Sequence, residues 1–534
     1  MTGGRVRRPR RGRVAVPSLV AGVGLAASLP PWGVWVVAPP AAAVLWWRLS
    51  GLRLRQRLLA GWLAGLGLFV PGLWWVFSFN VYGAAVLMGV EAVALALACT
   101  ACPSGRGRAA ALAGAMVLVE ALRSIWPFGG LPLGGVALGQ AGGPLAGADR
   151  LGGPLLLVGL VWLAGGGLGS VIAAAWGRWR AGAEPRWGRG RRLGPAGAGL
   201  SALVAVGAVA AWGSVAADGG AAVAVRRVAA VQGGGARGLR KAEVSPATVL
   251  AAERAATAEI PAADGGRAPS LVVWPEDVVS IDGSLGGSAD GRILADTAKH
   301  LGATLVVGVT ETVSATAFRN EIVVFGPDGA VVARFEKVHR VPFGEYVPDR
   351  AFFSHLANLS AVPLDAIAGH GDGLLDTPAG RLGAMVSYEV FFAERGWVST
   401  RAGAQLLVVP TNTASYATSQ VPTQEIAASR LQAIAEGRDL VQASPTGFSA
   451  LVDNRGTVLS LSSLGRRQVM IGDVALRSGR TLYERFGDLP VLVGAALLVV
   501  GGWVAAVTED TTSAMARRER AWLAHRRAPF PRGR

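Results

Sequence analysis

The sequence predicts a multi-pass α-helical membrane bundle that carries one α/β domain. Three observations lead to this fold class: an apolar composition, a series of apolar segments of membrane-spanning length, and one long segment with the strand and turn pattern of an α/β protein. Of the 534 residues, 51% are hydrophobic and 16% are charged, and the mean hydropathy is +0.41. Soluble domains average about 25% charged residues, so this composition favours a membrane protein.

Eight apolar segments approach the roughly 20 residues that a helix needs to cross a bilayer. Their bounds are 14–29, 32–47, 58–78, 81–101, 109–126, 153–176, 197–216 and, near the end of the chain, 489–508. We therefore expect a transmembrane bundle of about seven helices over 14–216 and a last transmembrane helix over 489–508. Prolines interrupt the first two segments, so residues 14–47 could form one helix, two helices, or a signal followed by one helix.

Arginine clusters alternate with connections that are poor in basic residues, and this alternation predicts the orientation. Basic clusters lie in the N-terminal segment 1–13, after the second, fourth and sixth apolar segments, and in the tail 509–534. Because Lys and Arg near short loops stay on the cytoplasmic side, both termini are expected in the cytoplasm. The segment 217–487 is then expected on the extracytoplasmic face of the cell membrane.

The net charge of +17 does not predict a nucleic-acid-binding protein, because many basic residues belong to these clusters between apolar segments. The two cysteines, Cys99 and Cys102, lie in or at the end of an apolar segment. We interpret them as small apolar side chains of a membrane helix, since two cysteines without nearby histidine suggest neither a disulfide framework nor a metal site.

The segment 217–487 has the pattern of an α/β domain. Short β-branched runs at 221–231, 271–274, 303–309, 321–325, 382–386 and 405–409 alternate with turn clusters and helical stretches. Three strands run into a polar residue: Glu276, Lys337 and Ser387. Groups at strand ends meet at one edge of an α/β fold, and a carboxylate, a lysine and a hydroxyl are the base, oxyanion stabiliser and nucleophile of acyl transfer.

Lysine is rare in this chain. Lys241, Lys299 and Lys337 are the only lysines among 52 basic residues, a bias toward arginine that is typical of high-GC genomes such as those of actinobacteria. Burial can neutralise a lysine but not an arginine, so a retained lysine at a strand end points to chemistry that arginine cannot perform.

Three blocks of the chain resemble the signature blocks of the apolipoprotein N-acyltransferases, which are membrane members of the nitrilase superfamily. The blocks are Trp274-Pro275-Glu276, the run from Lys337 to Pro348, and Ser387-Tyr388-Glu389, with further similarity at 72–76, 127–134, 231–233, Arg430 and 436–438. The resemblance extends over nearly the whole chain. It implies that residues 217–487 form a nitrilase-like (carbon–nitrogen hydrolase) domain, an αββα sandwich.

The resemblance also implies a two-step reaction. An acyl chain moves from a phospholipid donor in the bilayer to the enzyme, and then to the α-amino group of the diacylglyceryl-modified N-terminal cysteine of an apolipoprotein acceptor. Carried over by position, Glu276 is the general base, Lys337 stabilises the oxyanion, and position 387 holds the nucleophile. The resemblance assigns a supporting role in the pocket to Glu345, Tyr388 and Glu389. It implies no cofactor and no metal, and His339, His355 and His370 lack a ligand-like grouping.

The chain departs from the family at the nucleophile, where Ser387 replaces the family's cysteine. A serine hydroxyl is much harder to ionise than a thiol, and its ester is a poorer acyl donor to an amine than a thioester. Three interpretations therefore stay open at this point: an acyltransferase that uses Ser387, a catalytically impaired paralogue that acts as a membrane binding or scaffold protein, and a serine-type amidase or hydrolase. In some actinobacteria the family's domain is linked to a polyprenyl-phosphate mannose synthase, which is a possible partner for the scaffold interpretation.

Overall fold

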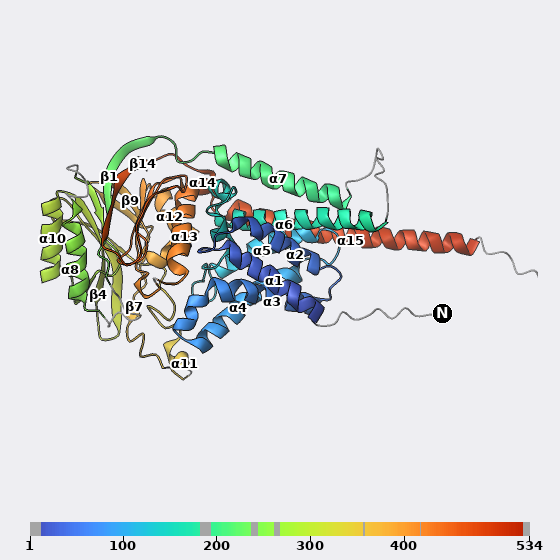
Figure 1. Ribbon diagram of the computed structural model, residues 1–534, viewed down its shortest axis with the longest axis horizontal. Helices are drawn as coiled ribbons and strands as arrows, with labels where there is room; N and C mark the ends of the chain where they lie inside the picture. The colour runs from blue at the N-terminus through green and yellow to red at the C-terminus, as the bar shows by residue number, and fades with distance from the viewer. Residues whose placement is uncertain are drawn as a thin grey trace, which may run out of the picture.

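A helical bundle is joined end to end with an α/β sandwich (Figure 1). The computed structural model describes residues 12–181, 194–235, 244–260, 268–355, 358–416 and 418–526. The basic segments 1–11, 182–193 and 527–534, which contribute to the predicted orientation, and Lys241 lie outside the described residues.

Among the described residues, eight helices build the bundle, and each overlaps one of the apolar segments of the sequence. They are α1 (Gly12–Ser28), α2 (Ala38–Arg48), α3 (Leu54–Gly72), α4 (Val81–Ala101), α5 (Arg108–Arg123), α6 (Asp149–Ala181), α7 (Pro195–Val215) and α15 (Leu489–Arg526). Within the described ranges, four helices are long and apolar enough to cross a membrane, at 81–101, 146–180, 195–215 and 489–509. These helices support the assignment to a membrane.

Helices α2 and α15 differ in length from the segments predicted at their positions. Helix α2 has only 11 residues, which corresponds to a length of about 16 Å, or half of a bilayer core. It begins only at Ala38 because Pro39 and Pro40 favour the first turn of a helix. Helix α15 runs 38 residues to Arg526, well past the predicted end at 508. It continues because neither glycine nor proline occurs between Gly502 and Pro529.

The sandwich contains two sheets. The first has the order β14-β1-β2-β4-β5-β6, with β3 beside β4 and β7 beside β5; the second has the order β13-β12-β11-β10-β9-β8. The strands of the first sheet are β1 (Ala222–Gln232), β2 (Leu271–Val273), β3 (Val279–Asp282), β4 (Thr304–Thr312), β5 (Ala317–Phe325), β6 (Val331–Glu336), β7 (Asp365–Ala366) and β14 (Gln468–Arg477). Those of the second are β8 (Leu374–Thr377), β9 (Gly380–Ala384), β10 (Leu406–Pro410), β11 (Leu440–Ala443), β12 (Ala450–Val452) and β13 (Val458–Leu461).

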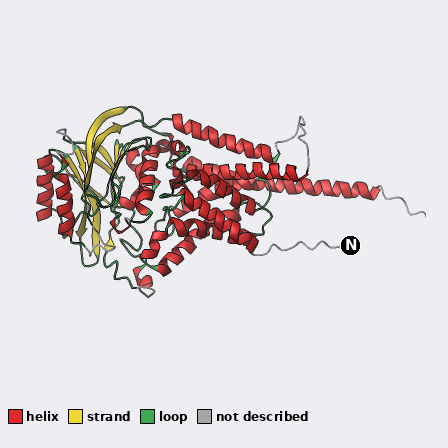
Figure 2. Ribbon diagram, in the orientation of Figure 1, coloured by secondary structure: helices red, strands yellow, loops and turns green. Residues whose placement is uncertain are grey.

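Helices cover the outer face of each sheet (Figure 2). Helices α8 (Pro246–Thr257) and α10 (Ala289–Leu301) lie on the first sheet, while α12 (Ala393–Arg401) and α13 (Val421–Glu436) lie between the second sheet and the bundle. Side chains such as Val228, Leu271 and Leu382 fill the space between the sheets. The layers therefore run helix, sheet, sheet, helix, and the predicted αββα fold class is confirmed.

The sandwich and the bundle share polar contacts through α13. Gln424 Nε2 donates to the carbonyl of Gly72 at 2.8 Å, and Gln420 Nε2 donates to that of Pro71 at 2.9 Å. Two short helices, α11 (Arg350–Ser354) and α14 (Leu482–Phe486), also belong to the domain. The end of α3 is therefore held directly against the domain.

A buried ion cluster shapes the loop that follows α5. Arg123 Nε donates to Glu91 at 2.5 Å and Nη1 to Glu120 at 2.9 Å, while Nη2 donates to the carbonyls of Leu131 at 2.9 Å and Leu133 at 3.0 Å. The Arg123 and Glu91 side chains are 4% and 1% exposed. Because an unpaired buried charge is unfavourable, the loop must stay where its carbonyls complete the shell of Arg123.

We expect Arg123→Met to lower the thermal unfolding midpoint of the detergent-solubilised protein strongly, because it leaves Glu91 buried without a partner. The loss of one member of a buried pair costs about 3–5 kcal/mol. The double variant Glu91→Gln/Arg123→Met is expected to regain part of this loss, since neither buried charge remains. Equal midpoints for the single and double variants would show that the pairing contributes nothing.

Candidate active site

The three predicted catalytic residues each lie just after the end of a strand. Glu276 lies three residues after β2, Lys337 follows β6 directly, and Ser387 begins a short 3-10 helix, Ser387–Phe391, after β9. Strands β2 and β6 belong to the first sheet and β9 to the second. The site therefore draws on both halves of the sandwich.

Lys337 lies between two carboxylates. Its Nζ donates to Glu276 Oε1 at 2.9 Å and to Glu345 Oε1 at 2.7 Å, and the side chain is 1% exposed. Asn320 Nδ2 donates to the same two oxygens, at 2.8 Å and 3.0 Å. A lysine can stay buried and charged in such a place because two carboxylates accept its hydrogen bonds.

Burial and the neighbouring charges shift the pKa values of Glu276 and Lys337. Burial raises the pKa of Glu276, and the positive charge of Lys337 counteracts the rise. Burial by itself lowers the pKa of Lys337, but the charges of Glu276 and Glu345 outweigh it, so this pKa lies above its usual value. A carboxylate with a raised pKa is a stronger proton acceptor than an exposed one, which suits a general base.

Ser387 occupies a strained turn. Its φ is +51°, a region that residues other than glycine rarely adopt and that is frequent at functional sites. The half-buried Ser387 Oγ accepts a hydrogen bond from the Thr411 hydroxyl at 3.1 Å, and the Thr411 carbonyl accepts one from the Glu276 amide at 3.3 Å. Thr411 thus links Ser387 to the loop that carries Glu276.

Glu389 ties the Ser387 turn to the Lys337 loop. Its Oε1 accepts from the amides of Val338 at 2.7 Å and His339 at 3.0 Å, and its Oε2 accepts from the amide of Val386 at 2.8 Å. The residue is completely buried. Three backbone donors on one carboxylate are charge-assisted hydrogen bonds, which position both loops.

The loop at 127–134 closes the site on the side of the bundle. Tyr388 Oη donates to the Gly130 carbonyl at 2.8 Å, and Tyr346 Oη donates to that of Phe128 at 3.0 Å. A cavity of about 250 Å³ opens at this junction. Its walls are Phe128, Gly129, Gly130, Val338, His339, Arg340, Tyr346, Tyr388 and Phe392.

All six residues singled out in the sequence thus belong to one connected arrangement. The Glu345 carboxylate, which binds Lys337 through Oε1, also accepts from the amide of Val341 at 2.8 Å through Oε2.

His339 stacks on Phe392 and pairs with Glu394, outside any metal-like grouping. Across the described part of the chain, no three His, Cys, Asp or Glu side chains come together in a way that could hold a metal.

Sequence reasoning missed Asn320, Thr411 and Glu425. Thr411 directly follows the buried strand β10, so the strand-end pattern that pointed to Glu276 and Ser387 could have found it. Glu425 is a buried carboxylate among the apolar residues of α13, which is an unusual position for a charge. Asn320 carries no such signal, because only the fold brings it to the two carboxylates.

Two family models and several named relatives match this chain. The family model "Apolipoprotein N-acyltransferase N-terminal domain" matches residues 21–167, and the model "Carbon-nitrogen hydrolase" matches residues 227–483. An apolipoprotein N-acyltransferase of Allorhizobium ampelinum is 30% identical over 84% of this chain and 87% of its own length. The chain belongs to the apolipoprotein N-acyltransferase family.

Other relatives carry the same name. One from the actinobacterium Mycolicibacterium smegmatis is 29% identical over 91% of this chain and 85% of its own length. One from Geobacter metallireducens is 35% identical, but this match covers 34% of this chain and 35% of the relative. Among solved structures, yeast Nit3 of the nitrilase superfamily covers 48% of this chain at 20% identity, with a TM-score of 0.36. Family membership therefore rests on the relatives matched along most of the chain.

We expect Glu389→Gln to loosen both loops that this carboxylate holds. The amide nitrogen cannot accept a hydrogen bond, so at least one buried backbone N–H loses its partner, at a cost of about 1–3 kcal/mol. Hydrogen exchange at the amides of Val338, His339 and Val386 should become faster. The control Glu259→Gln changes a carboxylate whose side chain is 49% exposed and pairs with Arg467, and it should leave these amides unaffected. Unchanged exchange in Glu389→Gln would contradict the positioning role.

Proposed function

We propose that this chain transfers a fatty acyl chain from a membrane phospholipid to the α-amino group of the diacylglyceryl-modified N-terminal cysteine of a lipoprotein. The observation that carries the proposal is the buried Lys337, held by Glu276 and Glu345, together with Thr411, which links the Glu276 loop to Ser387. This arrangement occurs in a chain related to apolipoprotein N-acyltransferases along most of its length.

The first step forms an ester on Ser387. Glu276 accepts the hydroxyl proton while Ser387 Oγ attacks the carbonyl carbon of the phospholipid ester. Lys337 stabilises the negative charge that develops on the carbonyl oxygen. The ester bond of the phospholipid then breaks, and the departing oxygen takes the proton from Glu276, so that a lysophospholipid leaves.

The second step forms the amide. The lipoprotein amine attacks the acyl carbon, and Glu276 accepts the proton that the nitrogen loses. The bond between the acyl carbon and Ser387 Oγ breaks with its electron pair on Oγ, and Oγ takes up a proton, which restores the hydroxyl. Glu345, Tyr388 and Glu389 support the loops around the reacting atoms. A site that had lost its chemistry would have no physical reason to keep a buried lysine between two largely buried carboxylates. This favours an active enzyme over an impaired paralogue or scaffold.

Both proposed substrates are anchored in a bilayer, which fits the position of the site. The cavity beside Tyr388 lies at the junction of the domain and the bundle, and aromatic side chains form part of its wall. An acyl chain could enter from the membrane without crossing open water.

A polyprenyl-phosphate mannose synthase as a partner stays a prediction.

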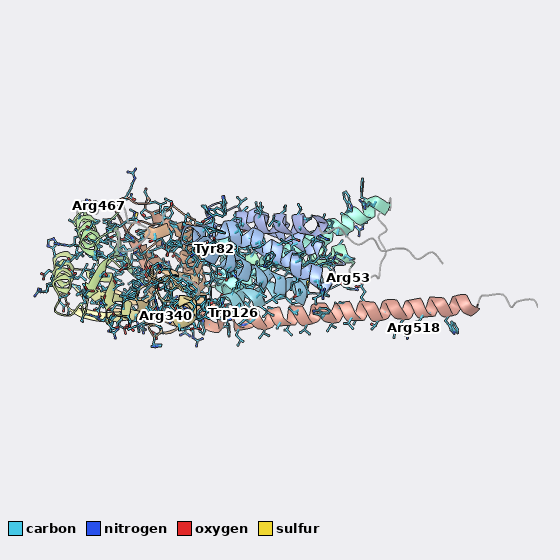
Figure 3. All side chains as sticks on the ribbon, turned by 90° about the horizontal axis from the view of Figure 1, so that it is seen from below. Arg53, Tyr82, Trp126, Arg340, Arg467 and Arg518 are labelled. Carbon is cyan, nitrogen blue, oxygen red and sulfur yellow. The ribbon has the colours of Figure 1, made fainter. Side chains whose placement is uncertain are left out.

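We also propose that the domain lies on the extracytoplasmic face and that both termini are cytoplasmic. Tyr82 and Trp126 lie near the junction with the domain, whereas Arg53 and Arg518 lie toward the other end of the bundle (Figure 3). Aromatic residues at a membrane interface and arginines on the cytoplasmic side are the expected distribution for this orientation.

Mass spectrometry of the full-length protein in detergent, after incubation with phospholipid, tests the acyl-enzyme. We expect an acyl adduct on the peptide that contains Ser387. Ser387→Ala should abolish the adduct, because no nucleophile remains, while Ser387→Cys should form it faster, because a thiol ionises more easily. An adduct elsewhere in the chain, or an adduct in Ser387→Cys alone, would contradict the proposed role of the serine.

Labelling with a membrane-impermeant maleimide tests the orientation. The native Cys99 and Cys102 are both completely buried, so they should give a low background. Asp296→Cys replaces a side chain in the domain that is 77% exposed and should react in intact cells. The control Arg55→Cys, at the proposed cytoplasmic end of α3, should react only after the cells are permeabilised, and the reverse pattern would overturn the orientation.

A further inference from the structure

The hydroxyl of Thr411 lies next to Ser387, and the carboxyl group of Glu425 lies next to that hydroxyl. The Thr411 hydroxyl oxygen lies 3.1 Å from Ser387 Oγ, and it also lies within hydrogen-bonding distance of the Glu425 carboxyl group. Thr411 is fully buried at the end of β10, and Glu425 is 1% exposed on α13. These three residues form a continuous polar path from the nucleophile into the interior.

The direction of the hydrogen bonds along this path depends on Glu425. A threonine hydroxyl carries one hydrogen and can donate it to only one partner at a time. When Glu425 is ionised, the Thr411 hydrogen is drawn to the carboxylate. When Glu425 is protonated, its own hydrogen can be donated to Thr411 Oγ1, and the Thr411 hydrogen is left for Ser387 Oγ. The protonation state of Glu425 thus decides whether Ser387 Oγ receives a hydrogen bond.

The surroundings of Glu425 favour the protonated state. Gln442 Nε2 donates to Glu425 Oε2 at 3.3 Å, which leaves Oε1, the oxygen next to Thr411, to carry a proton. The charged groups that face this carboxyl are Glu276 and Lys337. Burial, together with the negative charge of Glu276, raises its pKa to about 8, although Thr411 and Lys337 oppose the rise. Glu425 therefore holds its proton at neutral pH and loses it as the pH rises through about 8.

A serine needs such a proton more than a cysteine does. When the acyl-enzyme breaks down, the electron pair of the acyl bond departs on the side-chain atom of residue 387. A cysteine with a pKa near 8.5 departs as a stable thiolate, whereas a serine oxygen is far more basic and departs readily only if it is protonated at the same time.

We propose that Glu425 is a positioning residue for the second half of the reaction, because it acts through Thr411 to direct a hydrogen at Ser387 Oγ and to replace that hydrogen once it is transferred. This inference rests on the proposed function and deepens it. It assigns to this chain a device that compensates for the exchange of sulfur for oxygen at the nucleophile.

The step balances as follows. The amine nitrogen forms a bond to the acyl carbon, and the bond between that carbon and Ser387 Oγ breaks with its electron pair on Oγ. Oγ takes the hydrogen of Thr411, and Thr411 Oγ1 takes that of Glu425, which becomes a carboxylate. The proton lost by the amine goes to Glu276. The cycle closes when Glu276 releases this proton to water and Glu425 takes one up.

The test compares Glu425→Gln in two backgrounds, native Ser387 and Ser387→Cys, with the full-length protein in detergent micelles. Glutamine has the size of glutamate but no acidic proton. The donor is a phospholipid and the acceptor is a synthetic peptide with a diacylglyceryl-modified N-terminal cysteine. The readouts are the rate of N-acyl peptide formation and the fraction of acyl-enzyme, both by mass spectrometry.

With Ser387, we expect Glu425→Gln to slow amide formation about tenfold or more, in line with the contribution of proton transfer to catalysis, and to let the acyl-enzyme accumulate. In the Ser387→Cys background the loss should be at least about fivefold smaller, because a thiolate departs without a proton. The ratio of the native rate to the Glu425→Gln rate should also fall as the pH rises through about 8, since the native carboxyl is then ionised.

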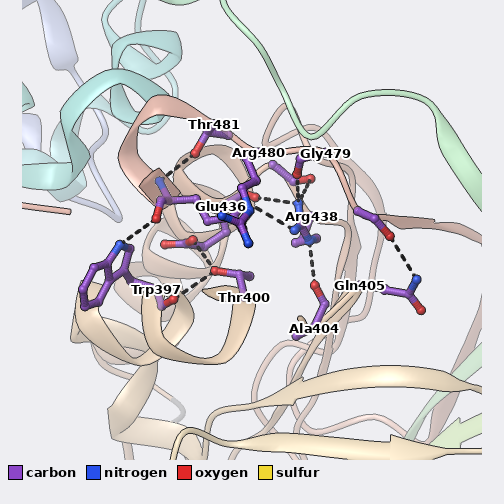
Figure 4. A network of polar contacts seen from close by, with 12 residues as sticks. Trp397, Thr400, Ala404, Gln405, Glu436, Arg438, Gly479, Arg480 and Thr481 are labelled. Carbon is purple, nitrogen blue, oxygen red and sulfur yellow. Dashed lines mark hydrogen bonds and ion pairs between the residues drawn. The ribbon is translucent and has the colours of Figure 1, made fainter. Parts of the chain in front are cut away.

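Glu436→Gln is the matched control. Glu436 lies on the same helix, is fully buried, accepts from the Thr400 hydroxyl at 2.6 Å, and has a pKa raised to about 8 by burial. It belongs to a separate network with Arg438 and Gly479 (Figure 4). This substitution should therefore affect folding but leave the ratio between the serine and cysteine backgrounds unchanged.

If Glu425→Gln fails to fold, Thr411→Val and Thr411→Ser in the same two backgrounds provide the test. Valine keeps the shape without the hydroxyl, and serine keeps the hydroxyl, so only Thr411→Ser should retain fast breakdown of the acyl-serine. Equal losses in both backgrounds, or no loss with Ser387, would overturn the inference and leave the acyltransferase intact. Absence of an acyl adduct and of N-acyl peptide with native Ser387 would instead overturn the proposed function.

Discussion

The pairing of one buried lysine with two carboxylates is the constraint on which the site depends. Taking a charge out of water is unfavourable unless partners of the opposite charge are held close by. Lys337 therefore requires Glu276 and Glu345 to converge on it, although they come from separate loops of the domain. Asn320 adds a donor to the same two oxygens, so that each of them accepts hydrogen bonds from two side chains.

The neighbouring loops follow from this requirement. Glu389 joins the segment after Lys337 to the turn that carries Ser387, and its three backbone donors leave little freedom to either. Tyr388 extends the same turn to the carbonyl of Gly130, in the loop shaped by Arg123. A chain of buried polar contacts thus leads from the bundle to the nucleophile, which explains how a strained serine can be kept in position.

Much of this architecture could be predicted from the sequence. Apolar strands that run into Glu276, Lys337 and Ser387 are a local signal, and so are the apolar segments of the bundle. The short α2 and the long α15 departed from expectation because prolines delay one helix and their absence prolongs the other. Thr411 and Glu425 became recognisable only when the fold placed them behind Ser387, since the partner of a buried polar group is set by tertiary contact and not by local pattern.

One hydrophobic core passes through both parts of the molecule. Leu45, Phe69 and Val161 of the bundle belong to the same buried cluster as Leu407 and Leu431 of the domain. The outer face of the second sheet, with α13 upon it, therefore packs against the bundle. This domain therefore cannot be cut from its helices without exposing an apolar face. Bundle and domain should consequently be inherited, exchanged and lost in evolution as a single unit.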